Sequence, residues 1–154
     1  MNTAIEIKKG IYWIGVNDRR THIFENYWPL PKGVAYNSYV IIDKKVVVLD
    51  TVERSHMDQY LESLEAVLQG RKVDYLIINH VEPDHTGSIK ALLSQYPETT
   101  VVGNAKTFPM LRNYYGIEQN LLEVKEGDTL NIGARTLTFA MAPMLHWPET
   151  MVTF

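Results

Sequence analysis

The feature that most constrains this chain is a ten-residue stretch, Asn79 to Ser88, with two histidines and two carboxylates in six consecutive positions. These four side chains are His80, Glu82, Asp84 and His85. A helix cap needs only one such polar residue, so we interpret the cluster as a metal site. Two imidazoles and two carboxylates without a thiolate suit iron, manganese or zinc and disfavour copper(I).

The flanking residues place this cluster between a strand and a helix. Before it, Tyr75–Ile78 is apolar and β-branched, which is typical of a buried central strand. After it, apolar residues recur at helical spacing over residues 89–96. The cluster therefore lies beyond the carboxyl end of a strand, where open α/β sheets usually bind ligands. Pro83 is expected to hold Glu82 out of the helical conformation and to stiffen the loop.

Local signals predict how two helices begin. Gly87 is expected to let the backbone bend into the helix after the cluster, which Ser88 would cap. An earlier helix over residues 57–68 shows one apolar face, with Ser55 as its expected cap. His56 stands at the start of that helix, and we expect it to face solvent.

The remaining segments predict mostly short strands. A hairpin is expected over residues 5–16, and a helix is expected to begin after Asn104 and to end at Gly116. Further strands are expected over residues 37–43, 46–50, 100–103, 121–124, 129–132, 136–140 and 150–154. The aromatic segment 17–36 reads as a long loop, either a functional one or a lid that only covers the core.

Composition excludes several classes of protein. A chain of 154 residues with 45% hydrophobic residues can form one domain with a core. A net charge of −3 argues against nucleic acid or an anionic membrane as the main partner. The absence of cysteine excludes disulfides, thiolate zinc sites and iron–sulfur clusters. Without a membrane-spanning run or a recognisable signal peptide, we expect a cytoplasmic protein.

A second candidate ligand comes about 60 residues after the cluster. His146 follows a predicted strand and lies between Pro143 and Pro148, which restrict its loop. A single loop histidine is usually only a hydrogen-bonded residue. Metal sites, however, often close with one such distant ligand, so we include His146 in the predicted site.

The motif His80-x-Glu82-x-Asp84-His85 resembles the metal-binding loop of the metallo-β-lactamase fold, in which hydrolases carry histidine at the middle position. Glutamate at that position, together with the stretch Leu145–Met151, is similar to the flavodiiron proteins. Shorter matches support the resemblance, at Phe24-Glu25-x-x-Trp28, Tyr36–Tyr39 and Asp50-Thr51. The resemblance covers nearly the whole chain. It implies an α/β layered fold, the αββα sandwich, with residues 1–154 forming roughly its amino-terminal half.

This resemblance implies a ligand set for two non-haem iron ions. His80, Glu82 and His146 would bind one iron, and Asp84 and His85 the other. The family's bridging aspartate and its last histidine ligand are expected beyond Phe154, as is the flavodoxin-like domain with its flavin mononucleotide (FMN).

Two further acidic residues have possible supporting roles. Asp50 would orient the motif loop from beneath, although a simple turn residue at the end of a strand is nearly as good an interpretation. Glu25 stands where some members of the family have a histidine near the metals.

The implied activity is reduction of dioxygen to water or of nitric oxide to nitrous oxide, with electrons from the flavodoxin-like domain and a rubredoxin-type donor. The alternatives are a zinc hydrolase acting on a thioester or ester, and a non-catalytic relic. Glu82 favours the redox enzyme over the hydrolase, and the intact donor set argues against a relic. The 154-residue chain by itself is expected to bind metal poorly and to be inactive.

The half-sandwich also predicts self-association. One face of its sheet would be apolar and uncovered, larger than the patch of a few hundred Å² that a soluble monomer normally tolerates. We therefore expect a homodimer related by a two-fold axis.

Replacing Ile77 with aspartate is expected to abolish folding, because it buries an unpaired charge in the predicted central strand. Circular dichroism of the purified variant measures this. A folded Ile77→Asp protein would contradict the assignment of this strand to the core.

Overall fold

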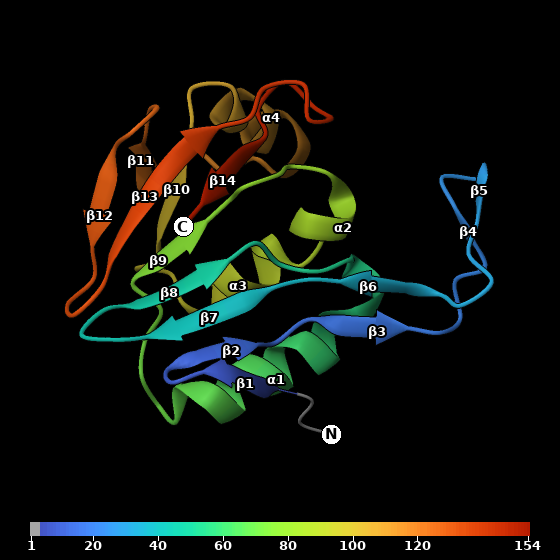
Figure 1. The fold of residues 1–154 in the computed structure, drawn as a ribbon, viewed down its shortest axis with the longest axis horizontal. Helices are drawn as coiled ribbons and strands as arrows, with labels where there is room; N and C mark the ends of the chain where they lie inside the picture. The colour runs from blue at the N-terminus through green and yellow to red at the C-terminus, as the bar shows by residue number, and fades with distance from the viewer. Residues whose placement is uncertain (1–3) are drawn as a thin grey trace.

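The computed structural model describes residues 4–154, and its main element is a mixed seven-stranded sheet (Figure 1). The strand order is β1-β2-β7-β8-β9-β10-β11. The first four of these strands are antiparallel to one another, and β8 to β11 run parallel. The bounds are β1 (Ile5–Lys8), β2 (Ile11–Trp13), β7 (Tyr39–Ile42), β8 (Val46–Leu49), β9 (Tyr75–Ile77), β10 (Thr100–Gly103) and β11 (Leu121–Glu123).

A three-stranded sheet and several helices complete the layers. The small sheet has the order β12-β13-β14, with bounds β12 (Thr129–Asn131), β13 (Thr136–Met141) and β14 (Met151–Thr153). The helical elements are the 3-10 turn η1 (Arg54–His56), α1 (Met57–Leu68), α2 (Pro83–Thr86), α3 (Ile89–Gln95) and α4 (Thr107–Tyr115). No helix among the described residues is long and apolar enough to cross a membrane.

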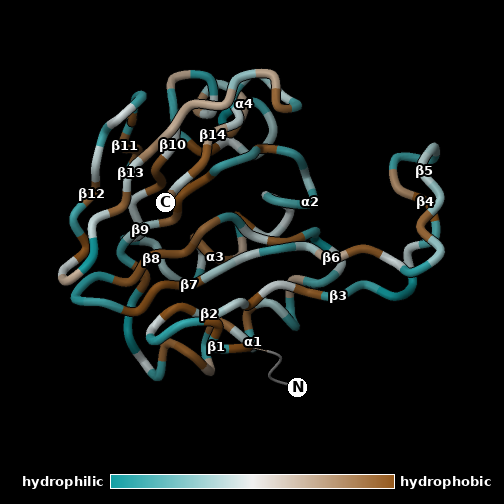
Figure 2. The backbone as a smooth tube through the Cα atoms, in the orientation of Figure 1, coloured by the Kyte–Doolittle hydropathy of each residue, from teal (hydrophilic) through white to brown (hydrophobic). Residues whose placement is uncertain are grey.

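Helices α1, α3 and α4 bury one face of the large sheet. Val46 and Val48 of β8 belong to this core, together with Tyr60 and Leu64 of α1, and all four are fully buried. Because side chains alternate along a strand, Val47 between them points to the opposite face. A strand buried on both faces is apolar throughout, and β8 is continuously hydrophobic in Figure 2.

The opposite face of the large sheet is covered by the small sheet. Val47, Ile77 and Val102 are fully buried there, packed with Phe139 of β13 and Met151 of β14. The expectation of an uncovered apolar face is therefore wrong, because the β12–β13 hairpin and β14 fold back across it (Figure 1). The argument for self-association loses its basis, and a homodimer stays a prediction. The burial of Ile77 agrees with its predicted place in the central strand.

The aromatic segment is a hairpin arm, so the expectation of a long irregular loop is wrong. Its strand pairs are β3 (Val16–Asp18) with β6 (Val34–Tyr36), and β4 (Ile23–Phe24) with β5 (Trp28–Pro29). Glu25 and Asn26 lie at the tip with φ of 52° and 56°, and the turn is closed by the Tyr27 N–H, which donates to the Phe24 carbonyl at 3.1 Å. The arm projects from the body, and Tyr27 and Trp28 are 75% and 58% exposed, so the tip is no cover for the core (Figure 1).

Both predicted serine caps are wrong. Ser55 lies inside η1, where the Glu53 carboxylate accepts its backbone N–H at 2.6 Å. Ser88 occupies the N-cap position of α3, but its hydroxyl makes no capping hydrogen bond. The N-cap position of α4 is held by Lys106 and not by Asn104, although Oδ1 of Asn104 accepts the backbone N–H of Thr107, the first residue of the helix, at 3.2 Å.

Two glycines are required for different reasons. Gly116 ends α4 in the left-handed conformation, with φ of 70°, as predicted. Gly87 has an ordinary φ of −58°, so it is not needed to bend the chain. A Cβ at Gly87 would lie 2.5 Å from the backbone nitrogen of Arg54 and 2.7 Å from the carbonyl oxygen of Pro83. Glycine is therefore required at this position because η1 and α2 lie too close together to leave room for a side chain.

His56 does not face solvent, and that expectation is wrong. Its side chain is 17% exposed, and its Nε2 lies 3.2 Å from Oδ2 of the buried Asp18. Burial by itself raises the pKa of Asp18, but hydrogen bonds from the Thr21 hydroxyl, the Arg20 backbone and His56 outweigh it. The net result is a pKa of Asp18 well below its usual range. This contact joins the base of the arm to the start of α1.

We expect Asp18→Asn to lower the free energy of unfolding at pH 7 by about 1–3 kcal/mol, the cost of removing a charged hydrogen-bond acceptor. Because the folded pKa is depressed, the stabilisation by Asp18 is fully present above the unfolded pKa of about 4 and is lost as pH falls below it. Urea unfolding between pH 3 and pH 7 should therefore show that the difference in free energy of unfolding between Asp18→Asn and wild type becomes smaller as the pH falls.

The control for this experiment is Asp58→Asn, which changes an exposed aspartate in the first turn of α1. We expect it to change stability by less than about 1 kcal/mol. A stability difference for Asp18→Asn that does not depend on pH would contradict the ionic role of Asp18.

Candidate metal centre

The candidate ligands gather because β8 and β9 are parallel neighbours. Leu49, the last residue of β8, pairs with Ile77, the last residue of β9. Asp50 therefore leaves one strand beside the point where Asn79 and His80 leave the other. The sequence motif thus lies at the carboxyl edge of the sheet, as predicted.

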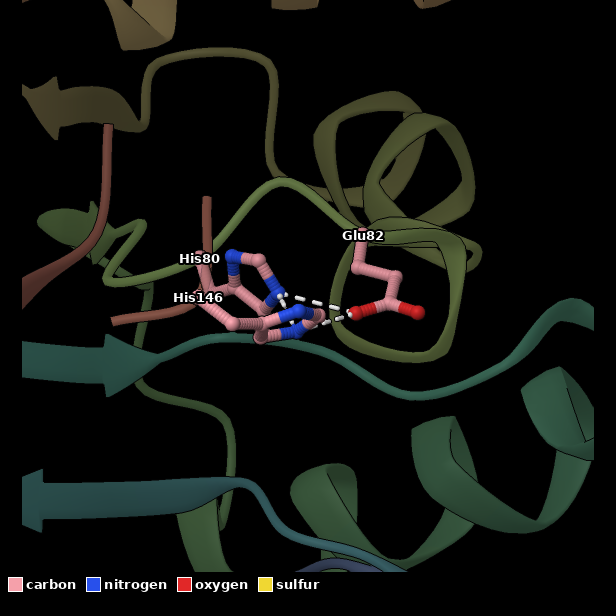
Figure 3. A group of neighbouring side chains, drawn as sticks. All are labelled: His80, Glu82 and His146. Carbon is pink, nitrogen blue, oxygen red and sulfur yellow. Dashed lines mark hydrogen bonds and ion pairs between the residues drawn. The ribbon is translucent and has the colours of Figure 1, made fainter. Parts of the chain in front are cut away.

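Three donor atoms converge at this edge (Figure 3). Nε2 of His80 lies 2.9 Å from Oε2 of Glu82 and 3.1 Å from Nε2 of His146, and that atom is 2.9 Å from the same carboxylate oxygen. Donors about 2.1 Å from one metal ion are about 3.0 Å apart at right angles and about 3.4 Å apart in a tetrahedron. The three atoms are therefore close enough to share one metal ion, and two histidines with a carboxylate are a donor set typical of non-haem iron.

The backbone of Glu82 frees its carboxylate for this cluster. Glu82 is the N-cap residue of α2, with ψ of 144°, and Pro83 follows at the first helical position. Pro83 thus excludes Glu82 from the helical conformation, as predicted. The Glu82 side chain makes no capping hydrogen bond and is only 7% exposed, so its carboxylate points to the two histidines instead.

His146 reaches the cluster from the loop between β13 and β14. Its imidazole is 67% exposed, whereas that of His80 is 10% exposed. The loop is closed on itself by the backbone hydrogen bond from Met144 N–H to the Trp147 carbonyl. The cluster therefore opens to solvent on the His146 side.

Asp84 and His85 form a second pair beside this cluster. Both lie on α2, with Nε2 of His85 3.6 Å from Oδ2 of Asp84, and the His85 ring centroid is 5.3 Å from that of His80. Among the described residues, Oδ1 of Asp84 and Nδ1 of His85 are buried without a hydrogen-bond partner. Burial raises the pKa of Asp84, against the attraction of His85. Buried polar atoms without partners are costly, and a bound cation would satisfy them.

Asp50 lies beneath the motif loop, where the sequence placed it. Its Oδ1 accepts the backbone N–H of Asn79 at 2.8 Å, and its Oδ2 lies 3.8 Å from Nδ1 of His85. Burial raises the pKa of Asp50 to about 6, although the nearby His85 and the backbone N–H groups lower it. Thr51 adds two hydrogen bonds to the His85 carbonyl, from its backbone N–H at 2.7 Å and its hydroxyl at 2.9 Å.

Glu25 is not brought to the cluster. It is exposed at the turn between β4 and β5, and Figure 1 shows this turn at the far end of the arm from α2. Its possible role near the metals finds no support in this position.

Sequence reasoning missed Glu149. This residue is fully buried, and its Oε1 lies 2.8 Å from Nδ1 of His80. The available signal was an acidic residue three positions after His146 and just before a strand.

The layers and the site define a class: a metallo-β-lactamase-type domain with glutamate in place of one ligand histidine. Comparison with known proteins gives the family. The family model described as ODP family beta lactamase matches residues 34–154, and the chain belongs to this family.

The similar proteins are flavodiiron proteins, which confirms the resemblance seen in the sequence. The chain is similar to the flavodiiron protein of Giardia intestinalis (34% identity, TM-score 0.94), covering 100% of this chain and 38% of that one. It is also similar to the rubredoxin oxygen:oxidoreductase of Desulfovibrio gigas (31% identity, TM-score 0.94), covering 99% and 38%.

Among curated relatives, the nitric oxide reductase of Moorella thermoacetica is 35% identical over 100% of this chain and 39% of its own length. The chain therefore spans about two fifths of the length of the proteins it matches. The predicted α/β lactamase-like fold is confirmed by these similarities. Metal ligation by the five predicted residues stays a prediction.

We expect His146→Ala to weaken metal binding at the three-atom cluster by more than about 100-fold, beyond the 10–100-fold cost of losing an outer partner. Folding should be retained, because the His146 side chain lies largely in solvent. Anaerobic titration with Fe²⁺ measures the affinity, and thermal unfolding measures the stability.

His22→Ala is the matched control, since His22 is an exposed histidine on the arm. It should leave both measurements unchanged. Unchanged metal content in the His146→Ala protein would show that His146 is no ligand.

Proposed function

We propose that this chain is the iron-binding part of an oxidoreductase that reduces dioxygen to water or nitric oxide to nitrous oxide. His80, Glu82 and His146 would hold one iron, and Asp84 and His85 would contribute to the second. The names of the Moorella and Desulfovibrio relatives support both substrates.

The observation that carries this proposal is the cluster formed by two histidine nitrogens and one carboxylate oxygen, 2.9–3.1 Å apart. A carboxylate is a harder and more anionic ligand than imidazole, which favours iron in a redox role over zinc in hydrolysis. Two adjacent metal ions would clamp a small oxidant and share the electrons that its reduction needs.

The residues of the chain hold the ligands in place before any metal arrives. Asp50 and Thr51 fix the backbone on both sides of the motif through Asn79 and the His85 carbonyl. Trp147 packs edge-on against the His80 ring, with centroids 5.3 Å apart, and shields it from water. Exposure of His146 leaves a route for a small gas and for electrons.

Electrons would come from a flavin, with FMN in a flavodoxin-like domain, and from a rubredoxin-type donor. The Desulfovibrio relative is named as a rubredoxin oxygen:oxidoreductase, which supports the second of these. The flavodoxin-like domain and the rubredoxin-type donor are both proposed for the whole enzyme.

The test compares metal preference and oxidant consumption. We expect a full-length protein, which carries this domain with the remaining ligands and the FMN domain that the family resemblance implies, to bind Fe²⁺ in preference to Zn²⁺ when it is prepared anaerobically. That protein, with ferrous iron and reduced FMN, should consume dioxygen or nitric oxide in proportion to bound iron. Reduction of one dioxygen to two water molecules takes four electrons and four protons, two electrons from the two ferrous ions and two from the reduced FMN. Two ferrous ions supply the two electrons that, with two protons, convert two nitric oxide molecules to nitrous oxide and water. A gas electrode and elemental analysis provide the measurements.

Glu82→His is the informative variant, because it restores the histidine of the hydrolase motif. We expect it to shift the preference from iron toward zinc and to reduce oxidant consumption. Stoichiometric zinc in the wild-type protein, together with thioester hydrolysis, would overturn the redox proposal in favour of a zinc hydrolase.

A further inference from the structure

Glu149 is a buried acid at the candidate centre that lies outside the converging donor group. It comes three residues after His146, near the end of the same loop and two residues before β14 begins at Met151. Its side chain is completely excluded from solvent. We infer that Glu149 is a positioning residue, which orients His80 for metal binding and anchors the loop that carries His146.

The hydrogen bonds of Glu149 determine which nitrogen of His80 carries the proton. Oε1 of Glu149 lies 2.9 Å from the backbone nitrogen of Val81 and 2.8 Å from Nδ1 of His80. A backbone N–H can only donate, so Oε1 is an acceptor in the first contact. It accepts from Nδ1–H of His80 in the second. With the proton on Nδ1, Nε2 is the nitrogen left to bind a metal ion placed between it, Glu82 and His146. In metal-free protein a proton takes the place of the ion between Nε2 and Oε2 of Glu82, which lie 2.9 Å apart.

The main chain of Glu149 has a separate task. Its carbonyl oxygen accepts a hydrogen bond of 2.6 Å from the side-chain amide of Asn104, which follows β10. The neighbouring loop residue Trp147 contacts the His80 ring edge-on. The same loop thus carries His146 and also the Glu149 carboxylate, which lies beside Nδ1 of His80. The positions of the two histidines are therefore linked.

Anchoring the loop of His146 does not by itself require a negative charge on the Glu149 side chain. Oε2 of Glu149 is buried and has no hydrogen-bond partner among the described residues. A neutral amide would supply the same acceptor to His80 and Val81 without the cost of burying a carboxylate. An anionic acceptor, however, holds an imidazole N–H more strongly than a neutral one, and so fixes the orientation of a ligating ring more firmly.

Two substitutions separate these tasks. Glu149→Gln keeps an acceptor oxygen but removes the charge, and Glu149→Leu removes both. A purely structural anchor would be served by glutamine as well as by glutamate. A positioning residue for the metal would not, because a neutral amide oxygen holds the His80 ring less strongly than a carboxylate does.

The first measurement is made on metal-free protein and is independent of the proposed enzyme function. Long-range ¹H–¹⁵N spectra of the imidazoles report which ring nitrogen carries the proton. We expect His80 to be protonated on Nδ1 in wild type and in Glu149→Gln, and to lose this preference in Glu149→Leu. An unchanged spectrum in a folded Glu149→Leu protein would overturn the inference.

The second measurement is anaerobic titration with Fe²⁺ alone. We expect affinity to fall about tenfold in Glu149→Gln and about 100-fold in Glu149→Leu, the range found for outer partners of metal ligands. The matched control is Glu126→Gln, which alters an exposed carboxylate that accepts only the Met141 backbone N–H, and should leave affinity unchanged.

If Glu149→Gln binds Fe²⁺ as tightly as wild type does, the charge of Glu149 does not contribute to metal binding. This variant tests the inference even if Glu149→Leu fails to fold. Failure of the full-length wild-type protein to bind Fe²⁺ would instead contradict the proposed function. The imidazole spectra would then still test the positioning of His80.

Discussion

The buried carboxylate of Asp50 is the contact on which the candidate centre depends. It follows β8 and accepts the backbone N–H groups at the start of the motif loop, at 2.8 Å from Asn79 and 3.4 Å from His80. Because β8 and β9 are parallel neighbours, this one side chain bridges the ends of two strands. Its own backbone is held by the Ser38 hydroxyl, which donates to the Asp50 carbonyl at 2.9 Å. The candidate ligands are thus attached to the ends of two strands whose side chains are largely buried.

The centre concentrates polar groups where the fold otherwise excludes water. Glu82, Asp84 and Glu149 bring three carboxylates close to His80 and His85, and several of their atoms have no hydrogen-bond partner among the described residues. Such an arrangement is costly in a metal-free core. The cost is explained if cations complete it, which is the physical reason to interpret the cluster as a metal centre instead of an ordinary polar loop.

Two loops from distant parts of the chain meet at the centre with different rigidity. The motif loop is pinned by Asp50 and Thr51, while the loop of His146 is pinned at its buried end by Glu149. His146 itself remains largely exposed. The result is a buried set of candidate ligands on one side and a solvent-accessible one on the other.

The sequence by itself determined those features of the structure that depend on residues close together in the chain. Apolar runs predicted the central strands, Pro83 predicted the extended conformation of Glu82, and the motif predicted which side chains would meet at the edge of the sheet. The place of His146 after a predicted strand and between two prolines, together with the family resemblance, brought it into the predicted site. These predictions succeeded because backbone conformation and side-chain alternation are local properties.

Tertiary structure decided the rest. The arm formed by residues 16–36, the contact of His56 with Asp18, the close approach that requires Gly87 and the covering of the sheet by β12 to β14 all depend on segments distant in sequence. The same holds for Glu149, whose role is visible only because Nδ1 of His80 lies beside it. Local patterns carry no information about which distant surfaces pack together, because that choice minimises the free energy of the whole fold.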